Sequence, residues 1–192
     1  MNNNNEHEIN IVLDLDQSMI CSEDFKEFDT IKYKNKMKNF AYEDFDKEYR
    51  IFKRPNLQIF LDYLFANFNV SVWTAASKDY ALFIIDKIIL RNKSRKLDHI
   101  LFGYHCDISD NVKGNTKNLS MFEDYFKGSK YRKDNTYIID DYIEVYNTQP
   151  EHCFLIKPFE FTKRYSEYDD ELLKMMKKLR KLKIQKNKKK NL

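Results

Sequence analysis

The sequence predicts an α/β protein in which a parallel sheet is flanked by helices. Short apolar runs, typical of buried strands, alternate along the chain with segments whose apolar residues recur at helical spacing. Polar residues follow directly after three of these runs: Asp14 after residues 9–13, Thr74 after residues 69–73, and Asp140 with Asp141 after residues 136–139. The carboxyl ends of parallel strands meet at one edge of a sheet, where ligands bind. The three signals therefore predict one functional site at that edge.

The length and composition fit a single globular domain. The chain has 192 residues, of which 42% are hydrophobic and 15% aromatic, enough to bury a core. Its apolar runs fall short of the roughly 20 residues that cross a bilayer, and residues 1–8, an Asn-rich segment that we expect to be disordered, lack the apolar stretch of a signal peptide. Three widely spaced cysteines suit a reducing compartment. We therefore expect an intracellular protein of the nucleus or cytoplasm that does not enter a membrane.

Charge is unevenly distributed along the chain. The formal net charge is +4, but residues 171–192 carry ten basic residues and one acidic residue, so the remaining chain is mildly acidic. We assign residues 9–184 to the folded domain and residues 185–192 to a basic tail. Two interpretations of this tail stay open: it contacts nucleic acid or an acidic partner, or it is the solvated end of a helix.

The first half of the chain predicts a strand, a small β insertion and two helices around a second strand. The insertion covers about residues 21–52, where segments 38–42 and 48–52 alternate as in short strands or a hairpin. Pro55 suits the first position of a helix, and an apolar stripe from Leu57 to Phe65 continues it. After the strand at residues 69–73, Ser77 can cap a helix over about residues 78–91.

The second half predicts three more strands and two helices. A strand is expected at about residues 99–104, followed by a polar region that contains Gly114 and Lys117. A short helix around residues 120–127 precedes the strands at 136–139 and about 153–156. A final helix, roughly residues 168–184, carries a leucine and methionine stripe.

Asp14 and Asp16 form the most informative single feature of the sequence. Residues two apart on a strand project to the same face, so both carboxylates leave the end of the first strand at one spot. Two carboxylates held together repel, and either one stays protonated or a cation is recruited. An acidic turn after a core strand would also give this pattern, but the polar residues at the other strand ends favour a functional site.

Eight short stretches, in order, carry a family resemblance. They are residues 14–18 (DLDQS), 53–55 (KRP), 72–80 (VWTAASKDY), 117–120 (KNLS), 138–141 (IIDD), 149–151 (QPE), 156–159 (IKPF) and 169–173 (DDELL). On these residues the chain resembles the haloacid dehalogenase superfamily, and within it the phosphatases of the RNA polymerase II C-terminal-domain type, also called NLI-interacting-factor-like. The resemblance covers about residues 9–183. It implies a Rossmann-like parallel sheet with a small β insertion after the first strand.

The resemblance also implies catalytic roles. Asp14 would attack phosphorus and become a transient aspartyl phosphate, which splits one difficult step into two easier ones. Asp16 would protonate the leaving oxygen and then activate water. Thr74 and the adjacent Ala75 would bind the phosphoryl oxygens, and Lys117 would neutralise their charge and orient the nucleophile.

A magnesium ion is the cofactor that this resemblance implies. Asp14, Asp141 and the backbone carbonyl of Asp16 would hold Mg²⁺, and Asp140 would support the metal or Lys117. Carboxylate, water and phosphate oxygens are the ligands that Mg²⁺ prefers. The chain departs from the family at Ser18, where Thr is usual, and other members have Asn in place of the second acid of the pair; we expect that acid to tune metal affinity.

The β insertion bears on the substrate. In relatives it helps to form an apolar groove beside the active site, which receives a Ser-Pro segment. Phe40, Tyr42, Tyr49 and Phe52 are candidates for such a groove here, or they pack the insertion. The resemblance implies a phosphatase for phosphoserine or phosphothreonine in a phosphoprotein, such as the tail of RNA polymerase II. A catalytically silent scaffold of the same fold, and a phosphatase for nucleic-acid ends or small metabolites, are the alternatives.

Overall fold

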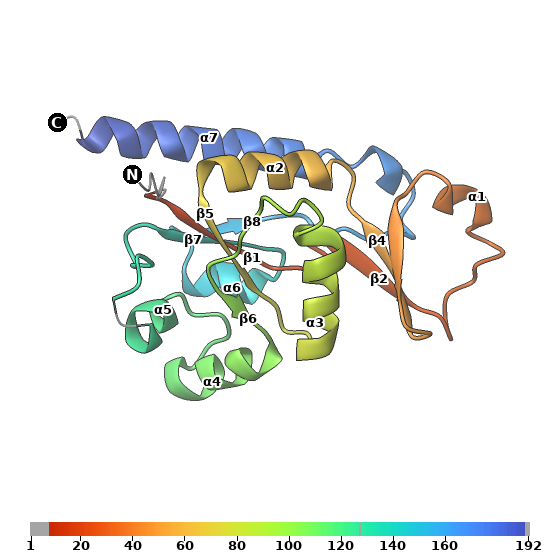
Figure 1. Ribbon diagram of the computed structural model, residues 1–192, viewed down its shortest axis with the longest axis horizontal. Coiled ribbons are helices and arrows are strands. Elements are labelled where there is room, and N and C mark those ends of the chain that lie inside the picture. The colour runs from red at the N-terminus through yellow and green to blue at the C-terminus, as the bar shows by residue number, and fades with distance from the viewer. Residues whose placement is uncertain (1–7, 127, 191–192) are drawn as a thin grey trace.

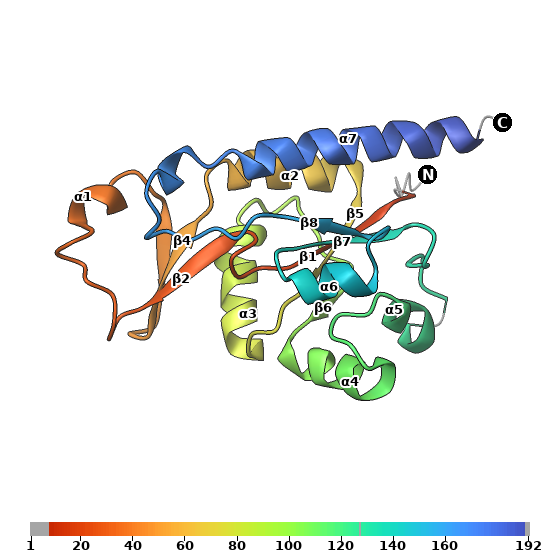
Figure 2. The same cartoon turned by 180° about the vertical axis from the view of Figure 1, so that it is seen from behind.

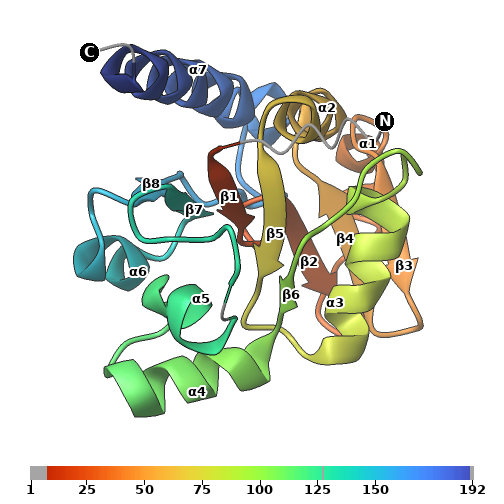
Figure 3. The same cartoon turned by 60° about the vertical axis from the view of Figure 1, so that its left-hand side comes forward.

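A five-stranded parallel sheet forms the centre of the protein. The computed structural model describes residues 8–126 and 128–190. The strand order is β6-β5-β1-β7-β8, and every neighbouring pair is parallel (Figure 3). The strands are β1 (Asn10–Leu13), β5 (Asn69–Trp73), β6 (Ile100–Leu101), β7 (Thr136–Asp140) and β8 (Cys153–Leu155). The predicted α/β class with a parallel sheet is confirmed.

Helices cover both faces of this sheet, as Figures 1 and 2 show from opposite sides. One face is covered by α2 (Leu57–Asn67), α3 (Lys78–Ile84) with the π-helical turn Ile85–Ile89, and α7 (Glu171–Lys190). The other face is covered by α4 (Gly103–Lys113), α5 (Ser120–Tyr125) and α6 (Ile143–Thr148). The layers are therefore helix, sheet and helix, with a hydrophobic core on each side of the sheet.

The alternation of side chains along β1 divides the two cores. Ile11 and Leu13 are fully buried against α2, α3 and α7, whereas Val12 is fully buried on the opposite face with Trp73 and Phe122. Strands buried on both faces read as continuous apolar runs rather than as an apolar–polar alternation. This is why residues 9–13 looked like a buried strand in the sequence.

The predicted β insertion is a separate three-stranded antiparallel sheet. It lies between β1 and α2 and has the order β2 (Ile20–Asp24), β4 (Tyr49–Lys53) and β3 (Tyr42–Phe45), with the short helix α1 (Lys34–Met37) before β3. Its own core is aromatic and includes two rings from beyond β8, Phe159 and Phe161. The rings of Phe52 and Phe161 stack with their centroids 3.6 Å apart.

Several predicted boundaries were wrong. The strand expected over residues 99–104 ends at Leu101, and α4 begins at Gly103, within that range. The strand expected at 38–42 instead begins at Tyr42. Helix α2 begins at Leu57 and not at Pro55, because Asn56 adopts a left-handed conformation, with φ of 65°, that a right-handed helix cannot include.

The C-terminal helix is longer than predicted. Helix α7 runs to Lys190 instead of ending near residue 184, so most of the expected basic tail is helical. A 3₁₀ turn, Ser166–Tyr168, precedes it. Residues 1–7, where disorder is expected, and residues 191–192 lie outside the described residues. Within the described part of the chain, every helix is too short or too polar to cross a membrane.

Candidate active site

The register of the sheet brings the predicted site residues together. Leu13 pairs with Val72 on one side and Ile139 on the other, so the residues that follow leave the sheet at neighbouring points. Asp14, Thr74 and Asp140 all line one pocket of about 780 Å³ at the carboxyl edge. Asp16, Ala75, Lys117 and Asp141 line the same pocket.

Lys117 joins two of these acids. Its Nζ lies 2.5 Å from Oδ1 of Asp14 and 2.7 Å from Oδ2 of Asp140, and all three side chains are almost fully buried. A buried charge of this kind is tolerated only where it is paired and hydrogen-bonded. One lysine between two carboxylates leaves the trio with a formal charge of −1.

Burial and neighbouring charges together raise the pKa values of Asp14 and Lys117. Burial raises the pKa of Asp14 to about 8, against the lowering effect of Lys117, and the negative charges of Asp140 and Asp16 raise it further. Burial lowers the pKa of Lys117, but its two carboxylate partners outweigh that effect and the net shift is upward. Additional positive charge beside Asp14 would therefore favour its ionised, nucleophilic form.

Three carboxylates in this pocket fit a divalent cation. Asp14, Asp140 and Asp141 each offer an oxygen, and these oxygens lie within 4.8 Å of one another. Ser18 donates a hydrogen bond from its hydroxyl to Oδ1 of Asp141, 2.9 Å away, which fixes that side chain toward the pocket. Oxygen donors in a partly buried acidic site are the set that Mg²⁺ prefers. Ser18 thus supplies the hydroxyl group that Thr would supply at this position in other members of the family.

Asp16 lines the pocket but is held differently. Its Oδ1 accepts a hydrogen bond from the hydroxyl of Tyr80, 2.8 Å away, and a longer one from the hydroxyl of Ser22, 3.4 Å away. Burial raises the pKa of Asp16, whereas these two hydrogen bonds lower it. A carboxyl with a raised pKa keeps its proton to higher pH than an ordinary aspartate, which suits a general acid. The metal contact through its backbone carbonyl stays a prediction.

Thr74 and Ala75 form the wall of the pocket beyond β5. Thr74 Oγ1 accepts a hydrogen bond from the amide of Ala76, 3.1 Å away, which leaves its own hydroxyl hydrogen available to a ligand. The start of α4 presses against this loop, because Gly103 donates its amide to the carbonyl of Ala76 at 2.8 Å. A Cβ added to Gly103 would lie only 2.8 Å from the carbonyl oxygen of Ala75, so this close approach requires glycine.

Lys117 is held in place by an unusual backbone conformation and by a glutamine. Its φ is 51°, in the left-handed region that non-glycine residues adopt rarely and often at functional sites. Gln149 donates from its side-chain amide to the carbonyl of Lys117 at 2.9 Å and accepts from the amide of Leu119 at 3.1 Å. Gln149 therefore clamps the loop that presents Lys117 to Asp14.

The proposed groove residues divide into two pairs. Phe40 and Phe52 are 8% and 0% exposed and pack inside the insertion, so the packing interpretation describes these two side chains. Tyr42 is 41% exposed. Tyr49 is half-buried, and its ring centroid lies 5.9 Å from that of Tyr80, the residue that hydrogen-bonds Asp16. Tyr42 pairs with Phe52 and Tyr49 pairs with Phe45, so the two tyrosines lie on opposite faces of the insertion sheet. The structure therefore does not bring the four predicted residues together in one groove, and only Tyr49 lies on the face that meets Tyr80.

The sequence did not assign roles to three residues that support the site. Tyr80 and Gln149 belong to the quoted stretches 72–80 and 149–151, yet nothing in one sequence shows that their side chains reach Asp16 and the Lys117 loop. The third is Arg54, which is 1% exposed and donates to the carbonyl of Ser18 at 2.9 Å, within the loop that carries Asp14 and Asp16. A lone KRP stretch before a helix gives no sign that its arginine turns inward.

Acids from separate strands, a bridging lysine and a hydroxyl at the carboxyl edge of a parallel sheet are the arrangement of haloacid-dehalogenase-type phosphatases. Comparison with known proteins leads to a narrower conclusion. The family model of NLI interacting factor-like phosphatases matches residues 9–190, and the chain belongs to this family.

Viral proteins are among the relatives. The chain is 45% identical over 171 residues to the CTD phosphatase-like protein 355R of Invertebrate iridescent virus 6, covering 86% of this chain and 94% of that protein. It is 41% identical over 179 residues to protein 355R of Invertebrate iridescent virus 3, which is also named CTD phosphatase-like, covering 88% and 94%.

Solved structures show the same fold. The structure of Fcp1, an essential RNA polymerase II CTD phosphatase, superposes with a TM-score of 0.55 at 17% identity, covering 88% of this chain and 49% of that one. The fission yeast Fcp1 variant R271A bound to beryllium fluoride gives a TM-score of 0.56 at 16% identity, covering 88% and 50%. The chain thus spans about half the length of the solved chains that it matches. The similarity confirms the fold expected from the sequence.

Proposed function

We propose that the protein is a Mg²⁺-dependent phosphatase that hydrolyses phosphoserine or phosphothreonine in proteins through an aspartyl phosphate on Asp14. The observation that carries this proposal is the contact of Lys117 with both Asp14 and Asp140, beside the carboxylate of Asp141. This geometry leaves one buried carboxylate aimed into a pocket, with positive charge beside it. A phosphate group needs the same two elements, a nucleophile and a neutralising cation.

The residues of the pocket can divide the reaction between them. Asp14 would attack the phosphorus atom and release the serine or threonine oxygen, and Asp16, held by Tyr80, would give that oxygen its proton. The same carboxylate would then take a proton from the water that cleaves the acyl phosphate and regenerates Asp14. Lys117 and the Thr74 hydroxyl would hold the phosphoryl oxygens through both steps. A bound Mg²⁺ would supply further positive charge to the phosphoryl group, with Asp14, Asp140 and Asp141 as its carboxylate ligands.

A protein substrate is supported by the names of the relatives. Both iridescent virus proteins are named CTD phosphatase-like, and the chain matches nearly their whole length. Repeats like those of the RNA polymerase II tail are therefore the first substrate to test. The half-buried ring of Tyr49, on the face of the insertion that meets Tyr80, offers a contact for the chain around the phosphorylated residue.

Turnover of a generic aryl phosphate tests the enzymatic part of the proposal. We expect the wild-type protein to hydrolyse p-nitrophenyl phosphate with Mg²⁺ and to lose this activity with EDTA or on Asp14→Asn. Asp110→Asn is the matched control, because Asp110 is an exposed acid on the same pocket, outside the carboxylate cluster. Loss of activity in both variants would mean that any lost negative charge in the pocket abolishes turnover, and would not support a nucleophilic role for Asp14. A wild-type protein without turnover and without fluoroberyllate binding would favour the catalytically silent scaffold.

A panel of phosphorylated ligands tests the substrate. Phosphoserine-proline and phosphothreonine-proline peptides would be compared with peptides that lack the proline and with oligonucleotides that carry a terminal phosphate. The proposal predicts higher kcat/KM for the peptides. Faster hydrolysis of the oligonucleotides would instead support the phosphatase for nucleic-acid ends.

A further inference from the structure

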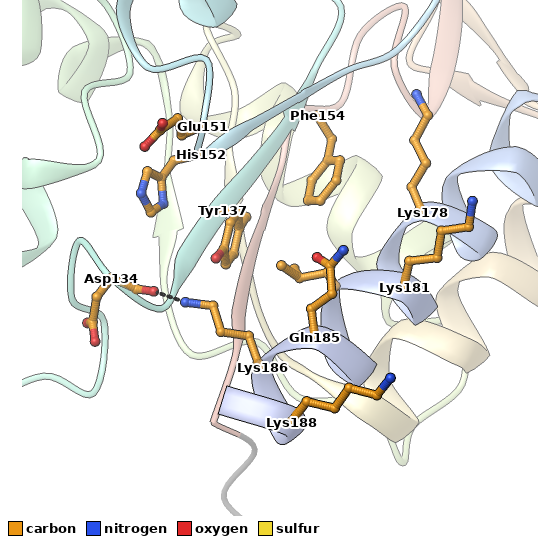
Figure 4. Close-up of a pocket in the computed structure, with 11 residues that line it drawn as sticks. Asp134, Tyr137, Glu151, His152, Phe154, Lys178, Lys181, Gln185, Lys186 and Lys188 are labelled. Carbon is orange, nitrogen blue, oxygen red and sulfur yellow. Dashed lines mark hydrogen bonds between the residues drawn. The ribbon is translucent and has the colours of Figure 1, made fainter. Parts of the chain in front are cut away.

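A second pocket lies between the final helix and the β7–β8 edge of the sheet. Its volume is about 950 Å³, and Figure 4 shows its lining side chains. Asp134 precedes β7 and His152 precedes β8, so the pocket lies toward the amino ends of strands whose carboxyl ends form the candidate active site. Among the described residues, none lines both pockets. A ligand here would therefore leave Asp14 and its neighbours accessible.

Lysines of α7 form one wall of this pocket. Lys178, Lys181 and Lys188 are exposed, and Lys186 is half-buried (Figure 4). From Lys178 to Lys188 the helix rises about 15 Å, at roughly 1.5 Å per residue. Ammonium groups distributed along such a length suit a chain of phosphates better than a single anion.

Aromatic rings form the floor. The ring of Tyr137 lies 5.0 Å from that of His152, with an angle of 25° between their planes, and 5.8 Å from that of Phe154. Tyr137 is only 6% exposed, whereas His152 and Phe154 are half-buried and reach the pocket. Lys186 lies 5.6 Å above the Tyr137 ring and donates to the carbonyl of Asp134, which fixes the helix over this floor. Flat rings beside a row of cations are the combination that binds unpaired nucleobases.

Two acids on the side opposite the lysines narrow the choice of ligand. Asp134 and Glu151 line the side of the pocket opposite α7, with their carboxylates turned away from the helix in Figure 4, and the Asp134 carboxylate pairs with Arg132 at 3.2 Å. They would repel a ligand that is anionic all round, such as polyphosphate or a multiply phosphorylated peptide. The ligand that fits the lysines and the rings is anionic along one side and carries flat rings along the other.

We propose that this pocket binds single-stranded nucleic acid. The phosphates follow the lysines of α7, and the bases lie against His152 and Phe154. The site is separate from the phosphatase reaction, so it stands or falls independently of the function proposed above.

Two double variants on α7 test the lysine wall. Lys178→Gln with Lys181→Gln removes two charges from the pocket, and Lys177→Gln with Arg180→Gln removes two exposed charges one position earlier on the same helix, outside the lining. Binding of a fluorescein-labelled 12-mer oligouridylate is measured by anisotropy from 50 to 200 mM KCl. Each lost phosphate contact reduces the slope of log K against log salt by about 0.7, so the pocket variant should lose about 1.4. The control variant should keep the wild-type affinity and slope.

Substitution at His152 tests the aromatic floor. His152→Ala should weaken binding roughly 5-fold or more through lost stacking, with an unchanged salt slope, and His152→Phe should restore it. Thermal unfolding of each variant confirms that it is folded, and Asp14→Asn should bind like the wild type. Three results would overturn the proposal: no binding at 50 mM KCl, equal losses in the two double variants, or competition by polyphosphate or a phosphoserine peptide of equal charge that matches the oligonucleotide. A deoxythymidylate 12-mer shows whether the sugar matters.

Discussion

The buried arginine before α2 gives the sharpest stability prediction. Arg54 makes a bidentate pair with Asp169, at 2.8 and 2.9 Å, and also donates to the carbonyls of Ser18 and Lys157 at 2.9 and 2.8 Å. Its side chain is 0% exposed and that of Asp169 is 17% exposed. One guanidinium thus connects the loop after β1, the segment after β8 and the residues just before α7. Arg54→Met would leave two carbonyls without this donor and the Asp169 carboxylate with only the amide of Glu171.

The expected loss is large because the partner charge stays behind. Removing one member of a buried ion pair costs about 3–5 kcal/mol. In a domain of this size each kcal/mol lowers the melting temperature by about 2–4 °C, so the shift is about 6–20 °C. Since Ser18 also positions Asp141, turnover of the aryl phosphate should fall as well.

Arg50→Met is the matched control. Arg50 makes a bidentate pair with Asp44, at 2.7 and 2.8 Å, but at the surface of the insertion, where the two side chains are 15% and 39% exposed. With its contact to the Tyr42 ring, this pair should contribute only about 1–2 kcal/mol. Urea unfolding and a thermal scan compare the two variants. Equal losses, or a loss below about 1 kcal/mol for Arg54→Met, would refute the reasoning.

Three further predictions concern the pocket. Lys117→Met should lower kcat by about 10²–10³, as expected for the loss of one group that stabilises the transition state, and a smaller decrease would argue against its contact with the phosphoryl group. Gly103→Ala should cost about 1–3 kcal/mol in urea unfolding, because its Cβ meets the backbone carbonyl of Ala75 at 2.8 Å, and an unchanged midpoint would contradict this close approach. The hydrogen bond from Tyr80 stabilises the ionised form of Asp16, so Tyr80→Phe should raise the pKa of Asp16 and shift the pH profile of kcat to higher pH. An unshifted profile would mean that Tyr80 does not set this pKa.

The sheet and its site were accessible from the sequence because their signals are local. Buried strands appear as apolar runs, and the residues after them, Asp14, Thr74 and Asp140, converge wherever parallel strands end together. The supporting contacts were not accessible in this way. Gln149 reaches Lys117 across 32 positions, and Arg54 reaches Asp169 across 115, so one sequence offers no pattern that connects them.

The elements that the sequence missed are those with few buried residues. Helix α4 buries only Cys106 and Ser109, and α6 buries only Val145, so neither shows an apolar stripe. Helix α7 continues past residue 184 although its apolar stripe ends there, since Lys and Gln are good helix formers.

The aromatic core of the insertion has a consequence for exchanging specificity between relatives. Phe159 and Phe161, which pack against Phe40 and Phe52, arrive from the far end of the chain. A transplant of residues 20–53 alone would set foreign rings against these two phenylalanines and disrupt the aromatic packing of the insertion. Segment 156–161 would therefore have to be transplanted together with the insertion.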